Sequence, residues 1–92
     1  MPFVQTSVVD SDGSITTAPA IVYGVLVAAE GTGGLWQLND STDDSGTDLI
    51  SGFAEASSQT YIDLSQSPVQ FSTGIRADLP GSNQILTVFY TS

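Results

Sequence analysis

Short runs of apolar, β-branched and aromatic residues alternate with turn-forming residues along the whole chain. Where the runs alternate they do so with a period of two, which is typical of pleated strands, whereas the i, i+3, i+4, i+7 spacing of a helix persists nowhere. The pattern predicts an all-β fold: an antiparallel β-sandwich, jelly-roll-like, of seven or eight short strands with little or no helix. The apolar runs span residues 3–9, 15–17, 20–29, 35–39, 49–54, 61–64, 69–71, 75–79 and 85–90.

The longest apolar run covers residues 20–29 and predicts a strand buried on both faces. It is about half as long as the ~20 residues that a membrane-spanning helix needs. The Gly-rich segment 30–34 is expected to end this strand as a hairpin loop, with residues 35–39 as the returning strand. In that strand Leu35 and Gln37 face opposite to Trp36 and Leu38. Further on, Gly52 is a predicted bulge.

The chain has 92 residues, which is enough for a single domain with one small core. We expect residues 1–92 to form one β-sandwich domain, with residues 1–15 as an N-terminal arm or first strand. Hydrophobic residues make up 40% and charged residues 12% of the chain, so it is too apolar to be a disordered acidic tail. Met1-Pro2-Phe3 lacks the basic stretch of a signal peptide, and we expect the protein to be made and kept inside a cell, or to leave it by a route that needs no signal.

The charge balance excludes several function classes. Ten carboxylates stand against one Arg, with no Lys, His or Cys, for a formal charge of −9. Such a chain lacks the cations that replace phosphate counterions on nucleic acid or that attract anionic membranes. It also lacks the usual general bases, amines and thiols of catalysis, and no cofactor is expected. The neighbours Asp43 and Asp44 cannot hold the ~5–9.5 Å carboxyl separation of a glycosidase, so the sequence predicts a protein that is not an enzyme.

An acidic stretch in the middle of the chain has two interpretations. Its carboxylates are those of Asp40, Asp43, Asp44 and Asp48. One interpretation is a Ca²⁺ loop, because hard cations take several oxygen ligands, although the spacing is not that of an EF-hand. The other, which we favour, is a solvated hairpin tip whose charges keep neighbouring molecules apart.

Candidate contact residues are few. Arg76, the one basic side chain, is expected to pair with a carboxylate, either as an intersubunit anchor or as an ordinary surface pair. Tyr23, Tyr61 and Tyr90 are expected in the core, whereas Trp36, just after the Gly-rich turn, is the aromatic most expected to be exposed. Lys residues on edge strands usually prevent aggregation, and this chain has none. We therefore expect its strand edges to be covered by contacts between the subunits of an oligomer.

The order of the motifs resembles that of small tailed-bacteriophage virion proteins with a compact β-sandwich, above all capsid decoration (cement) proteins. The resemblance rests on the run Ile21–Val27, a Gly-rich turn and a strand, followed by Asn39-Asp40, Ser45-Gly46-Thr47 and Leu49-Ile50. Pro68-Val69-Gln70-Phe71-Ser72-Thr73-Gly74-Ile75 and a short alternating strand complete it. It covers residue 16 to the end of the chain.

The resemblance implies a structural role on the outer surface of a phage head, with assembly in the host cytoplasm. The expected partners are two further copies in a homotrimer and the major capsid protein, whose mature shell the trimer would stabilise. We expect contacts from Phe3, Val4 and Val8 in the N-terminal segment, and from Arg76 and Trp36. The alternative is a tail, baseplate or fibre module, including a glycan-binding one that would use Trp36 and a Tyr.

Overall fold

The computed structural model describes residues 4–31, 33–42, 46–79 and 84–91, and every regular element in these ranges is a strand. This confirms the all-β prediction. Nine strands are present in the described ranges, against the seven or eight expected, and the shortest, β7, has three residues. They are β1 (Gln5–Val9), β2 (Gly13–Thr16), β3 (Ala20–Ala29), β4 (Gly34–Asp40), β5 (Thr47–Ala54), β6 (Ser58–Asp63), β7 (Val69–Phe71), β8 (Ile75–Asp78) and β9 (Gln84–Thr91).

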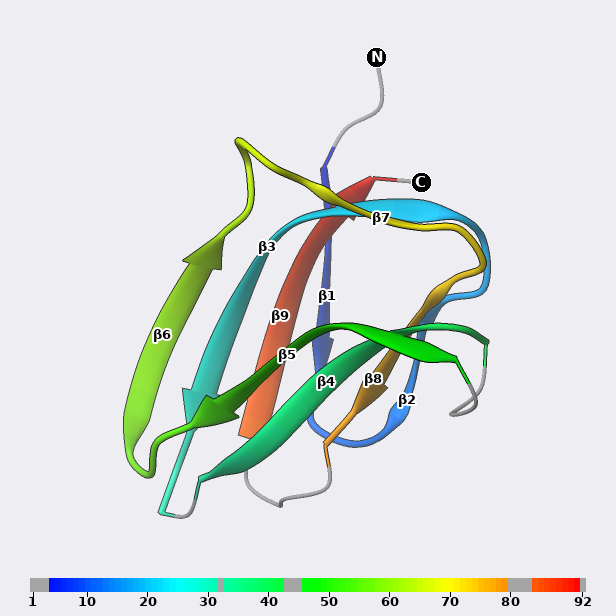
Figure 1. Cartoon of the computed structure of the whole chain (residues 1–92). Helices are drawn as coiled ribbons and strands as arrows, with labels where there is room; N and C mark the ends of the chain where they lie inside the picture. The colour runs from blue at the N-terminus through cyan, green and yellow to red at the C-terminus, as the bar shows by residue number, and fades with distance from the viewer. Residues whose placement is uncertain (1–3, 32, 43–45, 80–83, 92) are drawn as a thin grey trace.

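The strands form two antiparallel sheets packed face to face (Figure 1). The larger sheet has the order β1-β9-β3-β6, with β7 paired to the first part of β3, and the smaller has the order β2-β8-β4-β5. With β7 set aside, the first strand pairs with the last, the second with the next to last, and so on inward to β4 and β5. This nested pairing in two sheets is the jelly-roll arrangement.

The predicted hairpin between residues 20–29 and 35–39 is wrong. β3 lies in the larger sheet between β9 and β6, and β4 lies in the smaller sheet between β8 and β5. The Gly-rich segment therefore carries the chain across from one sheet to the other. The hairpin that does form joins β4 to β5, around the acidic stretch.

The core lies between the sheets. Val22, Val25 and Val27 of β3 face inward and are at most 3% exposed. They pack with inward residues of β9 and β8 and with Trp36 and Leu38 of β4. The outward positions of β3 are half-buried, so the expectation that this strand is buried on both faces is only half right.

Gly52 does not form the predicted bulge. The register of β4 and β5 shifts opposite Leu38 and Asn39, while Gly52 pairs regularly with Trp36. A Cβ on Gly52 would lie 2.8 Å from Cζ2 of the Trp36 indole, so the ring occupies the space that a side chain would need. Glycine is required here by close packing.

Two long-range hydrogen bonds tie turns to strands. The Leu79 N–H donates to Oδ1 of Asp12 at 2.6 Å, which attaches the β1–β2 turn to the end of β8. The Ser57 N–H donates to the Glu30 carbonyl at 2.7 Å, which attaches the β5–β6 turn to the end of β3. Ser57 has a φ of 56°, the left-handed conformation that a tight turn demands.

Candidate functional site

The carboxylate of Asp40 holds a turn and is not free for a cation. Its Oδ1 accepts the Thr73 N–H at 2.7 Å and the Gly74 N–H at 3.4 Å, and its Oδ2 accepts the Ser72 hydroxyl at 2.8 Å. These donors, the Thr73 amide first, lower the pKa of Asp40 below its ordinary value. Asp40 therefore fastens the β7–β8 turn to the end of β4.

Little remains of a Ca²⁺ loop in the described residues. Asp43 and Asp44 lie outside them, and Asp48 is an exposed residue near the start of β5. Among the described residues, no group of three or more His, Cys, Asp or Glu is placed to hold a metal ion. No helix within the described ranges is long and apolar enough to cross a membrane.

The hydrogen bonds of ionised Asp40 make the free energy of unfolding decrease at acidic pH. Because its pKa is lowered in the folded state, its contribution to the free energy of unfolding is complete above the unfolded pKa of about 4. That contribution disappears as the pH falls through the lowered folded pKa. Because these hydrogen bonds are exposed to solvent, we expect Asp40→Asn to lower the free energy of unfolding by up to about 1 kcal/mol at pH 7 and by much less at pH 2. Urea unfolding at both pH values measures this, and an equal loss at both would contradict it.

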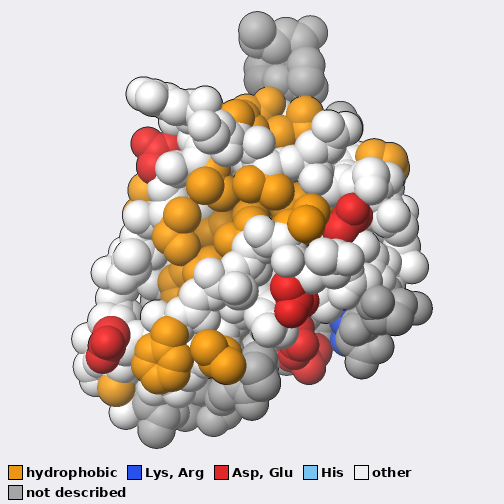
Figure 2. All heavy atoms as spheres, viewed as in Figure 1, with side chains coloured by type: hydrophobic (Ala, Val, Ile, Leu, Met, Phe, Trp, Pro, Cys, Tyr) orange, Lys and Arg blue, Asp and Glu red, His pale blue; other side chains and the backbone are white. Residues whose placement is uncertain are grey.

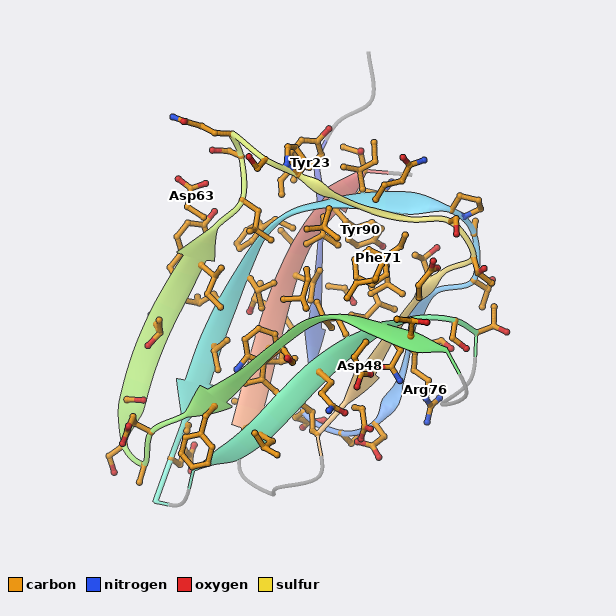
Figure 3. The ribbon with its side chains drawn as sticks, viewed as in Figure 1. Tyr23, Asp48, Asp63, Phe71, Arg76 and Tyr90 are labelled. Atoms are coloured by element: carbon orange, nitrogen blue, oxygen red, sulfur yellow. The ribbon has the colours of Figure 1, made fainter. Side chains whose placement is uncertain are left out.

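Trp36 is a core residue, so its predicted place at an interface or in a glycan site is wrong. It is 1% exposed, beneath Gly52 and opposite the larger sheet, whereas its neighbour Leu35 is 53% exposed. The prediction that Leu35 and Trp36 face opposite sides of the strand is confirmed. The side that faces the core is the one with Trp36 and Leu38. Tyr90 also belongs to the core, together with Phe71 (Figure 3).

Arg76 lies on the outer face of β8, in register with Ser14 of β2 and Asn39 of β4. It is half-buried, and its Nε and Oδ1 of Asn39 are buried without hydrogen-bond partners in the described structure. The Ser14 hydroxyl donates to the Thr42 carbonyl at 3.2 Å, which brings the loop after β4 close to this part of the sheet. The Nε edge of the guanidinium is thus enclosed by its own chain, and an intersubunit ion pair of Arg76 stays a prediction.

The N-terminal segment forms an edge strand. β1 pairs along its whole length with β9, which makes it the first strand of the sandwich. Val4 is 54% and Val8 65% exposed, while Phe3 lies outside the described residues. Val8 faces outward, opposite Thr87, on the face of the larger sheet that points away from the core.

This outer face of the larger sheet is apolar and nearly free of charge. Tyr61 and Phe89 meet edge to face on it, with ring centroids 5.9 Å apart, and the Tyr61 hydroxyl occupies the space above Gly24. Tyr61 is 54% exposed, so its predicted place in the core is wrong. The strands of this sheet contain a single charged residue, Asp63 at the end of β6. Asp63 lies at a corner of this face, which consists of Thr6, Val8, Gly24, Leu26, Ala28, Gln59, Tyr61, Asp63, Ile85, Thr87 and Phe89.

One hollow lies at the edge of this face. It has a volume of about 230 Å³ and is lined by Asp10, Glu30, Gln84 and Ile85. The carboxamide of Gln84 is buried, and its Oε1 and Nε2 have no hydrogen-bond partner within the described structure. Gln84 alternates with Leu86 toward the core, whereas Ile85 is partly exposed on the other side of β9. The carboxamide therefore belongs to the sandwich interior.

Comparison of the chain with protein-family models, with curated proteins and with solved structures finds no match.

Proposed function

We propose that this protein is a structural component of a tailed-bacteriophage virion that decorates the outer surface of the head as a homotrimer. The observation that carries the proposal is the outer face of the β1-β9-β3-β6 sheet, whose one charged residue is Asp63 at its corner, on a chain whose other described carboxylates lie in turns and at strand ends. A face with so little charge allows copies of a −9 chain to meet without bringing many carboxylates together. The jelly roll is also an architecture of viral capsid domains.

The size of the face suits a protein interface. The four strands comprise 5, 8, 10 and 6 residues, and at ~3.3 Å per residue and ~4.8 Å between strands they give a face of roughly 460 Å² in projection. A stable interface buries about 800 Å² of accessible surface on each partner. The accessible surface of the face is larger than its projected area, because side chains project from it. The face therefore supplies a large part of the area that a contact between copies needs, and the exposed edge of β1 lies beside it.

In this role the trimer binds neighbouring subunits of the mature shell and stabilises it by mass action, because it binds the assembled lattice in preference to free subunits. The acidic turns then face solvent and oppose further, unspecific association. No side chain has to perform chemistry.

Static light scattering on the purified chain tests the self-association. We expect the mass of three chains at micromolar concentration, and this mass should persist at high salt because the contact is apolar. A mass of one chain at high micromolar concentration would contradict the trimer.

A further inference from the structure

The two sheets separate along one side of the sandwich and leave an apolar wedge between β5 and β6. These two strands leave the turn 55–57 in different directions, β6 along the larger sheet and β5 across the smaller (Figure 1). Each is the last strand of its sheet, so each has a free backbone edge facing the wedge. Thr60 pairs with the core residue Val27 and therefore faces inward, yet its side chain is exposed. The smaller sheet thus does not cover β6 at this position.

The wedge is apolar inside. Near the turn it contains a pocket of about 80 Å³ that reaches Val27 and Trp36, with Phe53 and Ile62 at its sides. Farther from the turn, Ile50, Ile62, Leu64 and Val69 pack against the core but remain partly exposed. Figure 2 shows hydrophobic atoms gathered at the surface in this region, between β5 and β7.

A carboxylate lies at each end of the wedge. Glu55 follows the pocket at the turn, and Asp63 lies at the far end of β6, at the corner between the wedge and the outer face of the larger sheet; both are exposed. Asp48 does not belong to the wedge, because it pairs with Asn39 in the row that also contains Arg76. The hydroxyl and amide of Ser65 lower the pKa of Asp63, so this carboxylate is ionised at neutral pH. Arg76, the one basic side chain, lies on the other sheet, far from β6.

From this arrangement we infer that the wedge binds an extended segment of another protein, with an aliphatic side chain in the pocket and Lys or Arg on either side of it. The free edges of β5 and β6 offer backbone groups to an added strand, and the pocket accepts one side chain as an anchor. The carboxylates at its two ends, Glu55 and Asp63, and the net charge of −9 favour a basic partner and disfavour a second copy of this chain. That a shell subunit supplies the segment rests on the proposed function, whereas the chemistry of the segment rests on the wedge.

The test uses fluorescence anisotropy and a labelled heptapeptide in which leucines alternate with threonines between terminal lysines. We expect it to bind the whole chain. A peptide with serines in place of the leucines, and one with glutamates in place of the lysines, are each expected to bind at least about tenfold more weakly. Absence of binding by the first peptide, or equal binding by the serine peptide, would overturn the inference.

Two variants of the strands beside the wedge locate the binding. Thr60→Lys puts a cation into the wedge from β6, and Ser51→Lys puts the same charge on the outer face of β5, opposite Gln37 and away from the proposed trimer contact. Both positions are exposed, so both variants are expected to fold, which thermal unfolding verifies. Thr60→Lys should weaken binding of the leucine peptide by about tenfold or more and Ser51→Lys by no more than about threefold. Equal weakening would show attraction to the acidic surface alone and overturn the inference.

This experiment is separate from the proposed function. If the chain binds the peptide but is a monomer, the binding site in the wedge is supported and the trimer is contradicted. If the chain is a trimer but does not bind the peptide, the proposed assembly is supported and the binding site is contradicted.

Discussion

Trp36→Ala is expected to lower the free energy of unfolding by about 3–5 kcal/mol, the usual cost of truncating a large buried aromatic residue. The indole is 1% exposed and fills the space beneath Gly52, between the two sheets. The surrounding strands cannot close over the void without disturbing the register of β4 and β5. A domain of this size has only about 5–15 kcal/mol of stability, so a large part of the variant is expected to be unfolded at 37 °C.

Leu35→Ala is the matched control, because Leu35 is the preceding residue on the same strand but is 53% exposed. Its cost is expected to stay below about 1 kcal/mol. Urea unfolding followed by circular dichroism compares the two, since the first variant has no tryptophan signal. Similar costs for both variants would contradict the placement of Trp36 in the core.

Val8→Glu is expected to dissociate the trimer. Val8 is 65% exposed on β1, at the margin of the outer face of the larger sheet that lies farthest from Asp63. A carboxylate there would be buried unpaired against another copy, at a cost of several kcal/mol at each contact. We expect light scattering to give the mass of one folded chain over the concentration range in which the wild type is a trimer.

The control for this variant is Leu35→Glu, which makes the same change in charge at an exposed position of the smaller sheet. It should leave the trimer intact. If it dissociates the trimer and Val8→Glu does not, the copies meet through the smaller sheet and the outer face of the larger one is not the contact.

The strands were predictable because their inward and outward positions alternate in the sequence. The alternation separated Leu35 from Trp36 and Leu38 correctly. It could not reveal that residues 30–34 connect two sheets, because a local pattern determines which face of a strand is apolar and not which strand pairs with it. The supposed hairpin of β3 and β4 failed for this reason.

The candidate site was less accessible to sequence reasoning because its contacts join distant segments. The sequence groups Asp40 with the acidic residues next to it, but its hydrogen-bond partners are Ser72, Thr73 and Gly74, more than thirty residues away. The wedge depends on the separation of β5 and β6, which is set by how the two sheets pack. Val8 was found because it is an apolar residue within a predicted first strand, although only the register with β9 shows that it faces outward.

The number of copies of this chain in purified virions tests the central claim most directly. Quantitative densitometry against the major shell protein is expected to give a ratio near one copy per shell subunit, as a trimer at each local three-fold position requires. A few copies per particle would contradict the proposed function and place the chain in the tail, and absence from the particle would remove it from the virion.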